Sequence, residues 1–339
     1  MVRRGSILIV VLFVMAVVSL VALSLAYRAA LISRLARDGI IRIQLRAQAE
    51  SAVSLAMSTL ATDDNKFDHP AESWGRPPSP TSHGWMPEWL PSAQGQPAGF
   101  SVEYTVEDEQ GKVNVLHASS EALESLGLSK SQCDSLFDWM DADTDVRPEG
   151  AEQEYYGSLR HAYNCKNQPI ESLEELLLVR GFAVEDYSGG LSNSGYASGT
   201  PTASSGDEGM GQRAGAIDYL TVWGDGRINL NTAAEEVLHT LPISEGAVKQ
   251  ILAYRWFNPE GGEALEEHVF QSEQDIDQLQ GLSAADRGVL KDVATFQSRF
   301  FRIRVRCRHP RTGIGYNLSV LAQKSQNGPP QVLQWATQR

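Results

Sequence analysis

The residues best suited to chemistry in this chain are five carboxylates within twelve positions, Asp141, Asp143, Asp145, Glu149 and Glu152. They stand at places one, three, five, nine and twelve, which is the ligand spacing of an EF-hand calcium loop. Carboxylates this close together repel one another until a cation offsets their charge. The spacing therefore predicts a structural Ca²⁺ site, and a solvated acidic turn is the alternative.

The acidic stretch departs from an EF-hand at two places. Val146 occupies the sixth place, where an EF-hand has a Gly for a sharp turn, and Arg147 puts a positive charge inside the loop. We therefore expect a related geometry in which the Arg147 side chain points outward and its carbonyl is free to bind. Asn164 and Asn167, in the segment that follows, are further candidate ligands. Bound calcium would fix one helix against another and add its binding energy to folding.

Other chemistry finds little support. The seven histidines show no H-x-x-x-H or H-E-x-x-H spacing, and no nucleophile elbow or phosphate-binding glycine loop occurs, so we expect no enzyme. The net charge of −13 disfavours nucleic acid and anionic membranes as main partners because like charges repel.

The chain has three cysteines, which are too few for a disulfide framework. A Cys133–Cys165 bond and a pair of buried thiols stay open as alternatives.

The first element that must position the acidic loop is a long N-terminal helix. Residues 6–26 contain no charge, and as a helix they span about 31 Å, which matches a hydrocarbon core of about 30 Å. Residues 27–62 continue with apolar side chains at helical spacing. A retained membrane helix is predicted, with a cleaved secretory signal as the alternative. Arginines after the span favour a cytoplasmic flank, whereas Arg3 and Arg4 in the leader favour the opposite orientation.

Strand patterns and an internal repeat make up the rest of the chain. Residues 100–106 and 301–308 alternate apolar and polar side chains, and residues 313–322 can return as a hairpin partner. Residues 108–115 resemble residues 223–230, which indicates a repeat. Helical patterns follow each copy, at 118–126, 131–140 and 172–181 and again at 233–241, 245–254 and 272–281. The repeat predicts two helical modules inserted within a strand-based frame.

The N-terminal pattern also resembles a known family. A short basic leader ending in Gly5, followed by Ser6 and about twenty apolar residues, is similar to the precursors of type IV pilins and pseudopilins. Most members carry Glu as the fifth mature residue, and Val10 stands there instead, which fits the minor pseudopilin K subtype of type II secretion systems. The phrases Asp138-Trp-Met-Asp-Ala-Asp143 and Gly226-Arg-Ile-Asn-Leu-Asn-Thr232 resemble that subtype's own, so the likeness covers nearly the whole chain.

The resemblance implies an α+β fold in which a pilin-like long N-terminal helix and a small antiparallel sheet carry inserted helical modules of a SAM-like or helix-hairpin-helix-like kind. The expected order is a leader at residues 1–5, the membrane part of the helix at 6–26, its amphipathic continuation at 27–62, a pilin-like strand region at 63–107, a first helical module at 108–220 with the acidic loop and a mobile loop at 188–216, a second helical module at 221–295, and C-terminal strands at 296–339.

The resemblance also implies a function in assembly. A prepilin peptidase would cut between Gly5 and Ser6, and the helix would anchor a periplasmic C-terminal domain in the inner membrane as a single pass. The protein would initiate or cap the secretion pseudopilus at its tip, for export of folded proteins across the outer membrane. Implied partners are other minor pseudopilins of the I, J and H types and the inner-membrane assembly platform, with no nucleic acid. Calcium in the helical insertion is a family property, which adds to the expectation at Asp141, Asp143 and Glu152.

A DNA-binding or DNA-uptake protein anchored in the inner membrane is the alternative function. Residues 228–233 and 238–252 resemble the helix-hairpin-helix of competence-type DNA receptors. Such a hairpin presents backbone N–H groups to phosphate. Its turn here contains Glu245, which would face the phosphate, and the module lacks a basic patch.

Overall fold

The computed structural model describes the chain except for residues 1–4, 77–99, 184–214, 256–268, 326–327 and 339. The mobile loop predicted at 188–216, apart from its last two residues, lies outside the described residues. So does most of the irregular connection between residues 63 and 99.

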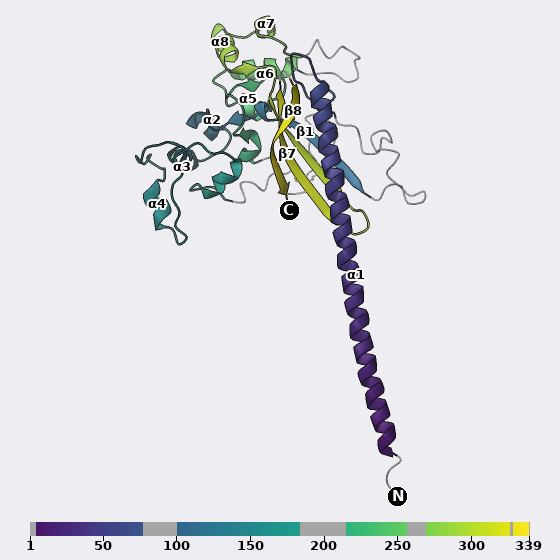
Figure 1. Ribbon diagram of the computed structural model, residues 1–339. Coiled ribbons are helices and arrows are strands. Elements are labelled where there is room, and N and C mark those ends of the chain that lie inside the picture. Colours follow the sequence, from purple (N-terminus) through teal and green to yellow (C-terminus); the bar gives the residue numbers. More distant parts are fainter. Residues whose placement is uncertain (1–4, 77–99, 184–214, 256–268, 326–327, 339) are drawn as a thin grey trace, which may run out of the picture.

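A single helix, α1 (Gly5–Thr62), runs from a protruding end into the head of the molecule (Figure 1). It has 58 residues, and by length and composition it is able to cross a membrane. The apolar side chains from Leu8 to Leu25 are exposed rather than packed against the head. The unbroken helix agrees with the sequence pattern, since no Pro interrupts it.

The second half of α1 packs on a sheet. Its buried side chains recur every three or four residues, as one face of a helix requires, and they are Ile41, Leu45, Ala49, Ala52, Val53, Ala56 and Leu60. Alanines at three of these positions allow the helix backbone to approach the strands closely. This layer of helix on sheet is one of two hydrophobic cores in the described part of the chain.

The sheet has four antiparallel strands in the order β1-β6-β7-β8. Their bounds are β1 (Ser101–Asp108), β6 (Phe300–Arg308), β7 (Gly315–Ser325) and β8 (Gly328–Gln338). Alternation in β6 turns Phe301, Ile303 and Val305 toward α1 and sends the arginines to the opposite face. Two of the arginines on that face, Arg302 and Arg304, form ion pairs with Glu109 and Glu107.

In Figure 1 the two helical modules lie to the left of the sheet and above its upper end, whereas α1 runs along the right. The first contains η2 (Glu109–Gly111), β2 (Val113–Asn114), α2 (Ser120–Ser125), α3 (Lys130–Met140), α4 (Gln153–Ser158), η3 (Leu173–Leu178), η5 (Ala216–Tyr219) and β3 (Leu220–Thr221). The second contains β4 (Ile228–Asn229), α5 (Glu235–Leu238), α6 (Glu245–Tyr254), α7 (Glu273–Gln278), α8 (Ala284–Val293) and β5 (Ala294–Thr295). The helix predicted at 172–181 is a shorter 3₁₀ helix, and the sequence patterns did not indicate α4 or α8.

The repeat in the sequence corresponds to a short parallel strand pair that occurs in both modules. β2 pairs in parallel with β3, and β4 pairs in parallel with β5, so each module begins and ends with a two-residue strand pair. The repeated Asn lies in the opening strand of each pair. Asn114 Nδ2 donates to Gly224 O at 3.0 Å, whereas Asn229 Nδ2 donates to Asp108 Oδ2 at 2.9 Å. The repeated residue therefore ties the start of each module to a neighbouring segment.

Candidate metal centre

The acidic loop folds back over the helix that precedes it. Asp134 and Asp138, one turn apart on α3, accept hydrogen bonds from the loop backbone, at 3.1 Å from Glu149 N and 3.2 Å from Arg147 N. Ser131 Oγ donates to Glu149 O at 3.1 Å. The sequence patterns did not indicate these two aspartates as part of the site. Their spacing of four residues just before an acidic loop was the available signal.

Gly150 allows the returning chain to pass close to α3. A Cβ at this position would lie 1.9 Å from Asp138 Oδ2, so a larger residue does not fit without movement. The close approach buries Ala151 and then Glu152, which is 3% exposed and is the N-cap residue of α4. The glycine thereby brings an acidic side chain into the interior.

Three of the seven predicted ligands meet at one point. Asp141, Asp143 and Glu152 each offer a carboxylate oxygen, and these oxygens lie within 4.8 Å of one another. Within the described part of the chain, Asp141 Oδ1, Glu152 Oε1 and Asn167 Oδ1 are buried without a hydrogen-bond partner. An unsatisfied buried oxygen costs about 1–3 kcal/mol. Buried, unsatisfied oxygens beside a carboxylate cluster fit a hard cation such as Ca²⁺.

Asn167 reaches this cluster from the segment after α4. Its Nδ2 donates to Asp143 O at 2.7 Å, which holds the side chain against the loop. Its backbone has a φ of 46°, a left-handed conformation that Asn tolerates better than most residues. The predicted candidate Asn167 is therefore positioned beside the cluster.

The other three predicted ligands lie outside the cluster. Asp145 and Glu149 are exposed, and Asn164 Oδ1 accepts a hydrogen bond from Gln153 Nε2 at 3.2 Å. For Asp145 and Glu149 the physical reason is that Asp134 and Asp138 on α3 bind the loop backbone at Glu149 N and Arg147 N. Val146 stands where an EF-hand has the glycine of its sharp turn, so the loop does not have the EF-hand geometry that would bring places five and nine to the ion.

Arg147 does not point outward, so that prediction is wrong. Its Nη1 lies 2.7 Å from Asp138 Oδ1 and 2.5 Å from Asp141 Oδ2. The guanidinium also lies over the Phe137 ring, 5.4 Å from its centroid. Because the Asp138 side chain is fully buried, it requires a counter-charge, and Arg147 supplies it.

The electrostatics of the cluster favour a cation. Burial raises the pKa of Glu152, and the nearby Asp138 and Asp141 carboxylates add to the rise.

Cys165 lies beside the cluster, with its Sγ 3.8 Å from Asp138 O. Cys133 and Cys165 are free thiols, so the disulfide alternative is not realised, and burial raises the pKa of each to about 11.

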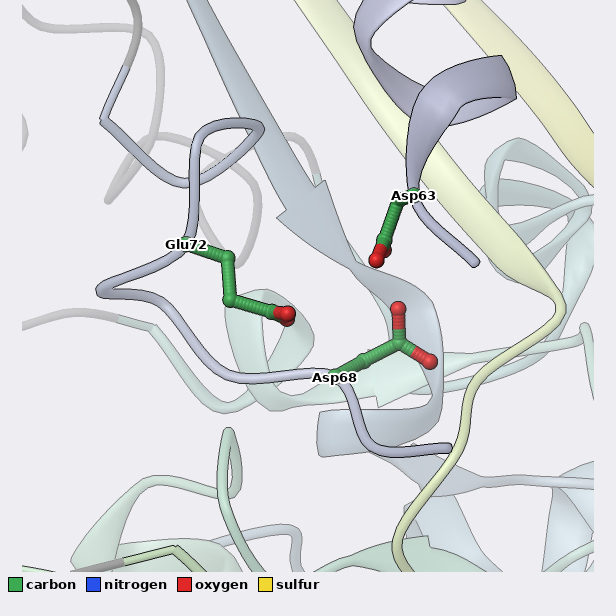
Figure 2. A group of neighbouring side chains, drawn as sticks. All are labelled: Asp63, Asp68 and Glu72. Carbon is green, nitrogen blue, oxygen red and sulfur yellow. The ribbon is translucent and has the colours of Figure 1, made fainter. Parts of the chain in front are cut away.

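Figure 2 shows a second acidic cluster in which Asp63, Asp68 and Glu72 point toward one another just after α1. Lys324 Nζ lies 2.8 Å from Asp63 Oδ2 and 3.2 Å from Asp68 Oδ1. Glu72 Oε2 accepts hydrogen bonds from His69 N and Trp74 Nε1. This cluster already contains its positive charge, and it links the end of α1 to β7.

Burial raises the pKa of Asp68 to about 7, although the Lys324 charge opposes the rise. Asp68 also bonds to a third segment, since its Oδ2 accepts from Ser298 N at 2.7 Å. The second cluster therefore joins the end of α1 to β7 through ion pairs and to the segment before β6 through a hydrogen bond.

The hairpin of the second module carries acidic side chains. Ser244 is the N-cap residue of α6, and its backbone N and Oγ both donate to Asp286, at 2.9 and 3.0 Å. Glu245 lies within 3.4 Å of Lys249 and His239. Phosphate recognition by such a hairpin uses backbone donors, and here a carboxylate already accepts from the Ser244 N–H.

Comparisons with known proteins agree with this architecture. Residues 100–189 match the family described as type II secretion system protein K. A chain in the crystal structure of the GspK–GspI–GspJ complex from the type 2 secretion system of enterotoxigenic Escherichia coli has the same fold, with a TM-score of 0.59. The two share 18% identity, and the match covers 89% of this chain and 99% of that chain. A comparison with curated proteins found no match. The family match confirms the resemblance to type II secretion protein K over residues 100–189, and the structural match shows that the fold is shared over most of the chain.

Proposed function

We propose that this protein is the tip subunit of a type II secretion pseudopilus, where it initiates or caps assembly with I-, J- and H-type minor pseudopilins. One observation carries the proposal. The first half of α1 is apolar and exposed, and it projects from a head that two inserted modules make wide. Such a helix requires lipid or other apolar helices around it. A head of this width fits the end of a filament better than its interior.

The tip position is tested by labelling. The full chain carrying a C-terminal epitope is co-expressed with the other pseudopilins and the assembly platform, and assembled pseudopili are viewed with gold-tagged antibody. Label confined to one end of each filament supports the proposal. Label spread along the filaments contradicts it.

We also propose that a prepilin peptidase cuts between Gly5 and Ser6 and that α1 is kept as a single-pass inner-membrane anchor with the head in the periplasm. The start of α1 at Gly5 and its apolar first half support this. Mass spectrometry of the native N-terminus tests it. Gly5→Ala should block the cut, and Gly39→Ala, at a site with no atom within 4 Å of an added Cβ, should not. A mature chain that lacks residues 6–26 contradicts the anchor.

A structural Ca²⁺ ion is proposed at the oxygens of Asp141, Asp143, Glu152 and Asn167. Three of these side chains have a buried oxygen that lacks a donor among the described residues, which supports the assignment. The bound cation would offset the carboxylate charges. The protein's own contribution is to hold these oxygens on the end of α3, the start of α4 and the segment between α4 and η3.

Thermal melting of the full chain in detergent, with calcium and then with chelator, tests this site. At a calcium concentration of about 100 times Kd, binding adds about 2.7 kcal/mol, which raises Tm by about 5–10 °C for a domain of this size. Glu152→Gln should lose the shift. Glu154→Gln, an exposed acid two residues away, should keep it. Absence of any shift in the unaltered protein rules the site out.

A further inference from the structure

The two oxygens of Asp141 have different surroundings. Oδ2 is held at 2.5 Å by Arg147 Nη1, and the same nitrogen lies 2.7 Å from Asp138 Oδ1. Oδ1 is buried and receives no hydrogen bond from the described residues. One oxygen of Asp141 is therefore fixed by a cation of the protein itself, while the other remains available to a ligand.

We infer that Arg147 is a positioning residue for the cation site, an inference that rests on the calcium function proposed above. By binding Oδ2, Arg147 fixes the orientation of the Asp141 carboxylate before calcium arrives. A ligand held in place in advance loses less conformational freedom on binding, so affinity rises. Arg147 thereby does for Asp141 what an outer-shell hydrogen-bond partner does for a metal ligand.

The surroundings of Arg147 make it suited to this role. Its backbone N donates to Asp138, and its guanidinium packs over Phe137, so the side chain is held at both ends. Its positive charge is offset by Asp138, which is fully buried and does not belong to the cluster of convergent oxygens. The Arg147–Asp138 pair is therefore close to neutral as seen from the site. For that reason the orientation of Asp141 outweighs the repulsion between Arg147 and calcium.

The contact geometry also shows which property of Arg147 matters. A single nitrogen, Nη1, makes both carboxylate contacts. An ammonium group at the same place can make both as well, because it carries three donors and a full charge. Lysine at position 147 should therefore retain the function, whereas an uncharged side chain of similar length should lose it.

Titration calorimetry with Ca²⁺ on the chelator-stripped full chain in detergent tests the inference. Arg147→Met should bind calcium about tenfold more weakly or worse, at unchanged stoichiometry, as changes to outer-shell partners commonly do. Arg147→Lys should stay within about threefold of the unaltered protein on the same reasoning. Arg160→Met, which removes an exposed arginine of the same module, is the matched control and should bind normally.

Arg147→Met also leaves Asp138 without its counter-charge, which threatens folding. The double variant Arg147→Met/Asp138→Asn removes that unpaired charge, and it should bind calcium as weakly as the single variant because Asp141 is still unheld. Equal or tighter binding by both methionine variants overturns the inference, since Arg147 would then act through repulsion or not at all. Absence of binding by the unaltered protein would instead overturn the calcium function itself.

Discussion

Gly150 offers a direct test of how the acidic loop is packed. In Gly150→Ala the new Cβ would lie 1.9 Å from Asp138 Oδ2, 2.8 Å from Asp138 Cγ and 3.2 Å from Arg147 Cβ. The φ of Gly150 is not positive, so the substitution acts through steric conflict and not through backbone conformation. The Asp138 carboxylate is fully buried and bonded to Arg147, so it cannot move away from the new Cβ without disturbing that ion pair.

The size of the effect follows from what must move. Overpacking of an interior costs about 1–3 kcal/mol, and loss of a buried ion pair costs about 3–5 kcal/mol. A partial shift of Asp138 that weakens but does not break the pair should destabilise the protein by about 2–4 kcal/mol, between those limits. At about 2–4 °C for each kcal/mol, Tm should fall by about 5–15 °C.

Thermal melting in the presence of chelator measures this effect without any contribution from bound cations. Gly157→Ala is the matched control, because it lies in α4 of the same module and its nearest neighbour would be 3.6 Å away. In a helix that change should stabilise by about 0.5–1 kcal/mol. If Gly150→Ala melts within about 2 °C of the unaltered protein, a shift below 1 kcal/mol, the packing of the loop on Asp138 described above is refuted.

Three further outcomes are expected. Arg302→Met should lower Tm by about 5 °C or more, because it removes an ion-pair partner that lies 2.5 Å from Glu109, a side chain that is 1% exposed. Arg308→Met, at an exposed position of the same strand, should change Tm little. Asp68→Asn should stabilise the protein more at pH 8 than at pH 5. The folded pKa of Asp68, about 7, lies above its unfolded value, so its favourable contribution is present at low pH and is lost as pH rises through 7. Parallel pH profiles of Tm for the two proteins would contradict this assignment. Alkylation of the cysteines at pH 8 should be slow until the chain unfolds, because burial raises the pKa of each thiol. The pKa is about 11 for Cys133 and Cys165 and about 12 for Cys307. Fast labelling of the folded protein would show instead that the thiols are accessible and ionised.

The opposite pH behaviour is expected of Glu109. Burial alone raises its pKa, but the charges of Lys112 and Arg302 outweigh burial and bring the pKa to about 2. The folded value lies below the unfolded one, so the stabilisation is present above about pH 4.5 and is lost as pH falls toward 2. Glu109 and Asp68 thus differ because one carboxylate has two cationic neighbours, whereas the other shares Lys324 with Asp63.

The two modules differ in the charge of the residue that follows their longest early helix. In the first module the residue after the long helix α3 is Asp141, and in the second the residue after α6 is Arg255. The Arg255 guanidinium donates to Leu230 O and Ala233 O at 2.9 and 2.6 Å, so the protein itself supplies the positive charge there. In the first module the residue at this position is acidic, and Arg147 pairs with it. Asp143 and Glu152 are the further carboxylates that an external cation would bind there.

Several features follow from the sequence by local rules. The length of α1, the alternation of β6 and the position of α3 each depend on periodicity within one segment, and the structure agrees with the predictions to within a few residues. Among the site residues, the sequence indicated Asp141, Asp143, Glu152 and Asn167. Their side chains hold oxygens of the right kind at a spacing that repulsion alone would not favour.

What the tertiary structure decided was which of the acidic residues converge and where Arg147 goes. Asp145 and Glu149 have the same chemistry as Asp141, yet the loop carries them to the surface because Asp134 and Asp138 on α3 bind its backbone. Those bonds join residues nine to fifteen positions apart, and the four-residue spacing of the two aspartates does not indicate which backbone groups they bind. Side-chain type and spacing thus determined which oxygens were available. The fold of the loop over the helix, governed by burial of a carboxylate that requires a counter-charge, determined which of them meet.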